Sequence, residues 1–187
     1  MPMPSSGKGQ HLATRRLALD AALLAAALML AFLEHLLPFG AWLPLPGFKL
    51  GLANLVTVLA FSLLSPVDAL VISLLRVGIT GVLFGSWTSL FFSFSGACFS
   101  FLALLSARLL LRRCSYIGVS VLSAAAHNLG QTLAAAMLSG AAAFPVFLTL
   151  WLPLLLPAAV VCGVLTGVLL NLSVPRLERW FKTWKNA

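Results

Sequence analysis

The sequence predicts an all-α integral membrane protein with six transmembrane helices. Of its 187 residues, 61% are hydrophobic and 9% are charged, whereas a soluble domain carries about 25% charged residues. Four acidic and twelve basic residues are too few to cover a soluble surface. The composition therefore excludes a soluble enzyme, a secreted disulfide scaffold and a disordered chain, and the length fits one domain.

Six apolar stretches come close to the roughly 20 residues that a bilayer-spanning helix needs. The second and third are the shortest, and Ser65-Pro66 separates them. Residues 1–14 are polar and are expected to form a mobile cytoplasmic N-terminus before a six-helix membrane domain over residues 15–173. Residues 174–187 are expected to form a basic amphipathic tail in the cytoplasmic interface. The expected spans are residues 16–37, 48–64, 67–84, 87–110, 115–138 and 146–172.

The basic residues predict the orientation in the membrane. They gather in three flanks, and the connections around residues 38–47, 85–87 and 139–145 carry no Lys or Arg. Lys and Arg are enriched on the cytoplasmic side of spans, so both termini are expected in the cytoplasm. Bases in short flanks, without a folded soluble module, predict no nucleic-acid partner. The flanking bases are Lys8, Arg15, Arg16; Arg108, Arg112, Arg113; Arg176, Arg179, Lys182 and Lys185.

The first expected span carries a strip of small residues. Ala18, Ala22 and Ala26 repeat every four residues, and small residues at that spacing let another helix approach closely. Two interpretations stay open, namely packing within this chain and docking of a separate membrane partner.

Lys49 and Asn54 lie near the start of the second expected span, after Pro44 and Pro46. Lys49 is the one base expected on the outer side, where the positive-inside rule disfavours it. Its ammonium either reaches back to the interface or attracts an anionic or polar ligand. Asn54 lies five residues further on, about 7.5 Å deeper by helical rise.

Arg76 is the strongest single indication of function in the sequence. It lies within the third expected span, where a charged side chain is costly unless it is paired or hydrated. Among the four acidic residues, Asp68 is eight residues away on the same helix and Glu34 is expected near the outside. Arg76 is therefore either half of a structural ion pair or a binding group for an anion.

Polar side chains also line the fourth and fifth expected spans. Ser89 and Ser93 belong to a serine stripe that faces either a cavity or a closely packed helix, with hydroxyls bonded to carbonyls. His127, Asn128 and Gln131 lie at helical spacing near mid-span, where polar groups usually face a cavity or the bundle interior. One histidine without a second ligand at metal spacing predicts no metal site.

Several catalytic signatures are absent from the sequence. It has no P-loop, so ATP hydrolysis requires another chain. It has no aspartate-rich run to hold Mg²⁺ on a diphosphate, and no Ser-His-Asp or Cys-His set. The sequence therefore predicts no catalytic residue and no cofactor of its own.

Three longer motifs occur in a fixed order: PGFKLGLANLVTVLA at 46–60, LLRVGITGVLFGS at 74–86 and IGVSVLSAAAHNLGQTLAA at 117–135. Together they resemble the Gx transporter family, also labelled heptaprenyl diphosphate synthase component I, over roughly residues 15–173. That family is similar to the substrate-binding S components of energy-coupling-factor (ECF) transporters. These are six-helix proteins whose alanine-rich first helix docks on a transmembrane coupling subunit that joins two ATPases.

The resemblance implies a multi-pass subunit of the bacterial inner membrane that binds a small molecule for uptake, with separate ATPase partners. It implies a flavin, quinone precursor or prenyl compound as ligand. The motif positions that it marks are Lys49, Asn54, Arg76, His127, Asn128 and Gln131. One alternative is a non-catalytic membrane component of heptaprenyl diphosphate synthase. Another is a membrane partner of an extracytosolic flavin or quinone electron-transfer system, for which the sequence has no cofactor-ligation motif.

Overall fold

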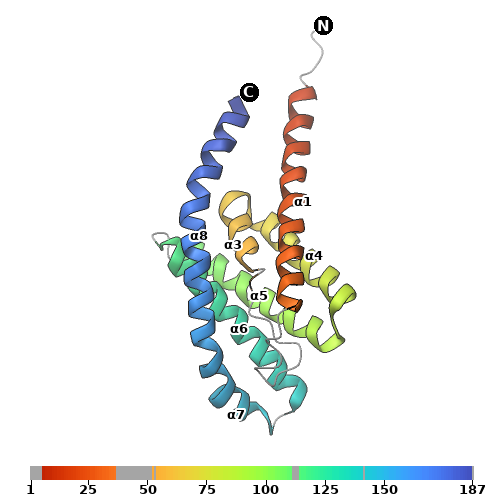
Figure 1. Ribbon diagram of the computed structural model, residues 1–187, viewed down its shortest axis with the longest axis vertical. Coiled ribbons are helices and arrows are strands. Elements are labelled where there is room, and N and C mark those ends of the chain that lie inside the picture. The colour runs from red at the N-terminus through yellow and green to blue at the C-terminus, as the bar shows by residue number, and fades with distance from the viewer. Residues whose placement is uncertain (1–5, 37–51, 53, 111–113, 141, 187) are drawn as a thin grey trace.

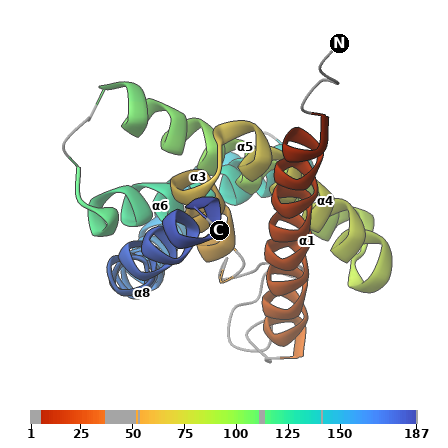
Figure 2. The ribbon, with the colours of Figure 1, turned by 90° about the horizontal axis from the view of Figure 1, so that it is seen from above.

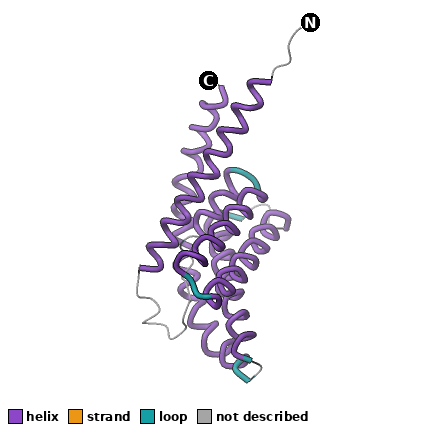
Figure 3. The backbone as a smooth tube through the Cα atoms, turned by 90° about the vertical axis from the view of Figure 1, so that its right-hand side faces the viewer, coloured by secondary structure: helices purple, strands orange, loops and turns teal. Residues whose placement is uncertain are grey.

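The described part of the chain is helical throughout, apart from short turns (Figure 3). The structure is a computed structural model that describes residues 6–36, 52, 54–110, 114–140 and 142–186. No strand occurs in these ranges, which confirms the all-α prediction. The helices are α1 (Ser6–Leu36), α3 (Asn54–Leu63), α4 (Pro66–Phe84), α5 (Trp87–Leu110), α6 (Tyr116–Ser139), α7 (Phe144–Val146), the π-helical turn η1 (Phe147–Trp151) and α8 (Leu152–Asn186).

Four of the described helical segments are long and apolar enough to cross a bilayer: α1 from Ala13, α4, α5 and the continuous segment from α7 to α8. They indicate a membrane protein. Helix α6 has 24 residues, but its polar residues near mid-helix lower its hydropathy. Helix α3 has only 10 residues, about half of what a span needs.

The ends of α4, α5 and α6 lie within one residue of the expected spans. Ser65 caps α4 by accepting a hydrogen bond from the Asp68 amide, and Ser115 caps α6 by accepting one from the Gly118 amide. The terminal helices are longer than expected, because α1 begins at Ser6 and α8 continues without a break to Asn186. The tail therefore extends the last span instead of leaving it at residue 174.

The helices pack in two groups. Helix α6 lies between α5 and α8, whereas α1 packs only against α3 and α4 among the described helices. Figure 2 shows α1 and α8 on opposite sides of α3. Both α1 and α8 extend past the other helices at the end where the two chain termini lie (Figure 1).

Helices α6 and α8 approach closely because glycine replaces a side chain at their contact. A Cβ atom at Gly163 would lie 2.5 Å from the Val121 Cα, and a Cβ at Gly167 would overlap the backbone of Ile117. Glycines four residues apart on one face are a common solution for close packing of membrane helices.

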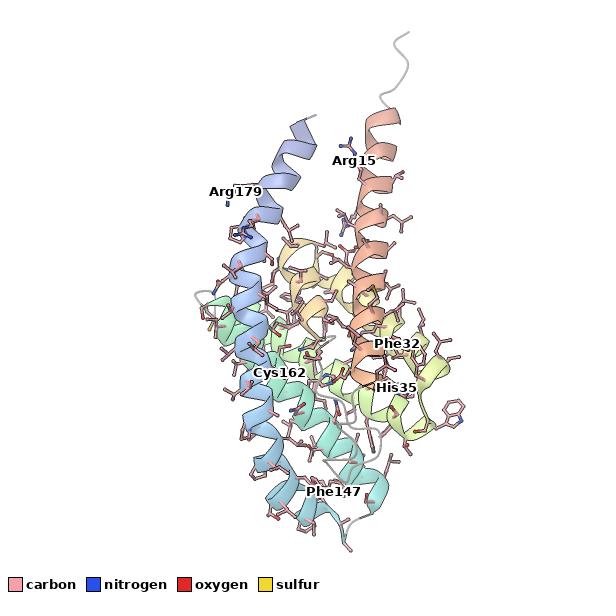
Figure 4. The ribbon with its side chains drawn as sticks, viewed as in Figure 1. Arg15, Phe32, His35, Phe147, Cys162 and Arg179 are labelled. Atoms are coloured by element: carbon pink, nitrogen blue, oxygen red, sulfur yellow. The ribbon has the colours of Figure 1, made fainter. Side chains whose placement is uncertain are left out.

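Helices α1 and α4 run parallel and are joined at both ends. At the end nearer the N-terminus, Arg16 Nε donates to Asp68 Oδ2 at 3.1 Å, and Arg16 Nη2 donates to Ser65 Oγ at 3.1 Å. At the other end the rings of Phe32 and His35 lie 5.3 and 5.5 Å from the Phe84 ring (Figure 4). The last turn of α1 is therefore fixed beside the last turn of α4.

Candidate functional site

The predicted ligand-binding residues that the structure describes are all buried, each at most 6% exposed. Lys49 lies outside the described residues, so its predicted role stays a prediction. The others come from four helices and fall into separate groups. They are Asn54 on α3, Arg76 on α4, Ser89 and Ser93 on α5, and His127, Asn128 and Gln131 on α6.

Arg76 is 4% exposed near the middle of α4. Its Nε atom has no hydrogen-bond partner among the described residues, and no ion pair within those residues involves its guanidinium. Thr80 Oγ1 donates to the Arg76 backbone carbonyl at 2.8 Å. This hydrogen bond does not involve the Arg76 guanidinium. The Arg76 guanidinium is thus a buried donor whose Nε makes no hydrogen bond within the described residues.

Glu34 is the one acidic side chain that is buried among the described residues. It lies on the last turn of α1, and its side chain, 5% exposed, continues a buried stripe with Ala27 and Ala31. Glu34 is not among the site residues that the sequence predicts, although its spacing from the two buried alanines is a visible signal.

Asn54 belongs to a closed polar network that joins α3, α5 and α6. Its Nδ2 donates to Ser123 Oγ at 2.9 Å, and Ser100 Oγ donates to Asn54 Oδ1 at 2.8 Å. The two serine hydroxyls lie 2.7 Å apart. These contacts give Asn54 a structural role, and at Ser100 they favour the packing interpretation of the serine stripe.

His127 packs against α5 at a glycine. A Cβ atom at Gly96 would lie 2.8 Å from the imidazole Cε1 and 2.9 Å from both ring nitrogens. One turn further along α6, Ser95 Oγ donates to the Gly130 carbonyl at 2.8 Å. Gly96 therefore allows the buried imidazole to lie flat on α5, close to the buried Gln131.

Asn128 faces α8 rather than α5. Its Nδ2 donates to the Leu155 carbonyl at 3.0 Å, between Pro153 and Pro157. Its Oδ1 has no hydrogen-bond partner among the described residues. Asn128 thus links α6 to α8 and keeps a buried acceptor available.

The described contacts do not bring all predicted residues together. Helices α4 and α6 do not pack directly against each other in the described chain, so Arg76 lies on one side of the interior and His127 and Gln131 on the other. Ser89 and Ser93 lie on α5, which packs against both helices. Convergence of these groups around one ligand stays a prediction.

The strip of Ala18, Ala22 and Ala26 is exposed on α1. The small residues that α1 buries are Ala27 and Ala31. The face of α1 with Ala27 and Ala31 therefore packs inside the chain, whereas the predicted strip lies on a different, exposed face.

The described interior contains both charged and neutral polar side chains. It offers one guanidinium, one carboxylate, amides, hydroxyls and an imidazole. In the described ranges no group of three His, Cys, Asp or Glu residues could hold a metal ion. This set can hold an oxyanion and hydrogen-bond to the polar groups of a small molecule.

Residues 23–173 match the family model of heptaprenyl diphosphate synthase component I. The chain belongs to this family. The match begins within α1 and covers every predicted site residue except Ala18 and Ala22, and it confirms the family that the three motifs indicate. No curated protein and no solved structure matches the chain. The similarity of this family to ECF S components stays an expectation.

Proposed function

We propose that this chain is a substrate-binding membrane subunit that takes up a small molecule and is energised by separate ATPase partners. The observation that carries the proposal is Arg76, which is buried in an apolar helix without an ion pair among the described residues. A buried charge is strongly unfavourable unless it is paired and hydrogen-bonded. A ligand anion would supply the missing partner.

We further propose that α3 and α6 complete a six-helix bundle in the bacterial inner membrane. The polar residues of α6 are buried between α5 and α8 and not exposed to lipid, which makes its low hydropathy compatible with a membrane position. Arg15 and Arg179 lie on the parts of α1 and α8 that extend past the bundle (Figure 4). This clustering of bases supports cytoplasmic termini.

The exposed alanine strip supports docking of a transmembrane coupling subunit. Because α1 packs only against α3 and α4 among the described helices, Ala22 can meet another helix without displacing its own bundle. We expect Ala22→Leu or Ala26→Leu to abolish co-purification of the partner while the protein stays folded. The control is Gly78→Leu on the exposed part of α4, where a Cβ meets nothing within 4 Å. Loss of folding in the alanine variants would instead indicate internal packing.

The experiment that tests the proposal is a pull-down from native membranes. A transport subunit should bring down a membrane coupling protein with ATPases. Capture of a soluble prenyl synthase instead would contradict transport and establish the second function below. Capture of a flavoprotein would indicate electron transfer. Native mass spectrometry of the gently solubilised protein would then show whether the bound molecule is a flavin, a quinone precursor or a prenyl compound.

The second function is a non-catalytic membrane component of heptaprenyl diphosphate synthase, which the family description favours. In that case a partner chain carries the diphosphate chemistry, because the described residues of this chain offer no acidic cluster for Mg²⁺.

A further inference from the structure

We infer that the interface between α3 and α6 binds an internal water molecule, held by the hydroxyls of Thr57 and Ser120. The two side chains are 2% and 1% exposed, and neither hydroxyl makes a hydrogen bond within the described residues. A buried hydroxyl without a partner costs more free energy than a hydrogen bond contributes, and internal water commonly satisfies such groups. A water site here joins α3 to α6 whatever small molecule the chain binds.

The hydroxyls of Thr57 and Ser120 differ from those of two other buried residues. Thr80 and Thr132 each donate to the carbonyl four residues earlier in their own helix, at 2.8 Å, as serine and threonine often do within helices. Thr57 Oγ1 and Ser120 Oγ have no such acceptor among the described residues. A small hydrogen-bonding molecule at the interface would supply the partner that both lack.

The contacts on either side of the two hydroxyls fix how α3 and α6 run past each other. Asn54 of α3 donates to Ser123 of α6 at 2.9 Å. Further along, Val58 of α3 belongs to a buried apolar cluster against which Val119 of α6 packs. Increasing residue numbers on α3 therefore correspond to decreasing numbers on α6, so the two helices are antiparallel.

This register places Thr57 and Ser120 on one level of the interface. Thr57 follows Asn54 by three residues and Ser120 precedes Ser123 by three, and residues three apart share a helix face, with Cβ atoms about 5–6 Å apart. Both hydroxyls therefore lie one turn from the Asn54–Ser123 hydrogen bond, in the same direction. One water molecule bridges oxygens up to about 5.5 Å apart, because each O–H···O bond spans about 2.5–3.0 Å.

The amide of Asn54 offers a third hydrogen bond to the water. Its Nδ2 carries two hydrogens, and the described residues use one of them, in the bond to Ser123. Internal waters typically make about three hydrogen bonds. The two hydroxyls and this amide hydrogen provide that number, so the polar network that joins α3, α5 and α6 extends by one turn.

The test is a double-mutant cycle on the full chain, unfolded by denaturant in detergent. Thr57→Val and Ser120→Ala each remove a hydroxyl and leave the carbon skeleton nearly unchanged. With a bound water, each variant should raise the unfolding equilibrium constant about fivefold. The double variant should raise it by clearly less than the product of the two effects, because the first substitution already weakens the site. Removal of a hydroxyl that has no partner would instead stabilise the protein.

Thr132→Val is the matched control, because its hydroxyl is as buried as that of Thr57 but bonds its own helix. Its effect should multiply with that of Thr57→Val without coupling. A crystal structure of the native chain in a lipid mesophase then distinguishes a water from a direct bond between the hydroxyls. We expect density within about 3 Å of both oxygens.

Three results would overturn the inference. The first is a folded Thr57→Val or Ser120→Ala protein that is as stable as the native protein or more stable. The second is a cycle in which the two effects multiply without coupling. The third is a native structure without density between the two oxygens, including one in which they bond directly. If either variant does not fold, the density in the native chain decides alone.

Discussion

Asn54 shows how a polar residue in an apolar helix can serve the fold. It is one of the motif positions, but its amide donates to Ser123 and accepts from Ser100, and these bonds join three helices. Inside a bundle, an unsatisfied polar group costs more than the hydrogen bond itself contributes. The network therefore holds α3, which has only 10 residues, against α5 and α6.

We expect Asn54→Ala to lower the free energy of unfolding by about 1–3 kcal/mol, because it leaves buried hydroxyls of Ser100 and Ser123 without their amide partner. Thermal unfolding in detergent, followed by circular dichroism, measures the effect. The control is Ser62→Ala on the same helix, whose hydroxyl bonds only the Val58 carbonyl of its own helix. An Asn54→Ala protein that keeps its stability but loses ligand would assign Asn54 to the binding site instead.

Residue types in apolar spans are visible without knowledge of the tertiary structure, whereas their partners are not. A charged or amide side chain stands out in a hydrophobic stretch, so Arg76 and the polar residues of α6 could be predicted to be buried. The pairing of Asn128 with Leu155 and the burial of Glu34 depend on which helices become neighbours. The expectation that Glu34 lies near the outer side of the membrane stays a prediction, whereas the burial of its side chain follows from the packing of α1 against its neighbours.

At the scale of elements, the helix boundaries that could be predicted are those marked by a capping residue in the local sequence. Ser65 and Ser115 cap helices through their side-chain hydroxyls, and such caps can be identified from sequence. The far ends of α1 and α8 have no such signal, because a polar flank and an amphipathic tail can each continue a helix. Only the structure shows that α8 remains helical past Pro175 to Asn186.

The contact between α6 and α8 gives a prediction for element packing. We expect Gly163→Ala to destabilise the protein by about 1–3 kcal/mol, since the added Cβ overlaps the Val121 backbone and overpacked interfaces relax poorly. Detergent unfolding curves compare it with Gly118→Ala on α6, where the nearest atom to an added Cβ is Ser115 Oγ at 3.6 Å. Equal stability of the two variants would contradict the close approach of these helices.

At the scale of the whole molecule, both chain termini and the bases Arg15 and Arg179 lie at one end of the bundle (Figures 1 and 4). Ser6 begins α1 at that end, and Ala142 lies in the turn between α6 and α7 at the opposite end (Figure 1). We propose that the first end faces the cytoplasm, as the distribution of Lys and Arg indicates. The six-span count and this orientation are tested together by labelling.

We expect a membrane-impermeant thiol reagent to label Ala142→Cys in intact cells and to spare Ser6→Cys until the membrane is opened. The background is a chain in which the three native cysteines, Cys98, Cys114 and Cys162, are replaced by serine. Restoring Cys114, which is exposed at the start of the segment before α6, should reproduce the behaviour of Ser6→Cys. Labelling of Ser6→Cys from outside, or protection of Ala142→Cys, would contradict this topology.

The central claim is that Arg76 binds the anionic group of a small molecule within the bundle. The most direct measurement is isothermal titration of the molecule released by native mass spectrometry into the native protein, Arg76→Ala, Arg76→Lys and the exposed-site control Arg176→Ala. We predict that Arg76→Ala weakens binding by about 2 kcal/mol or more, which is about thirtyfold, as for a lost charge-assisted hydrogen bond. If the contact is bidentate, Arg76→Lys should recover only part of the binding free energy that Arg76→Ala loses. Arg176→Ala should leave the affinity unchanged. Unchanged affinity in folded Arg76→Ala would contradict the claim.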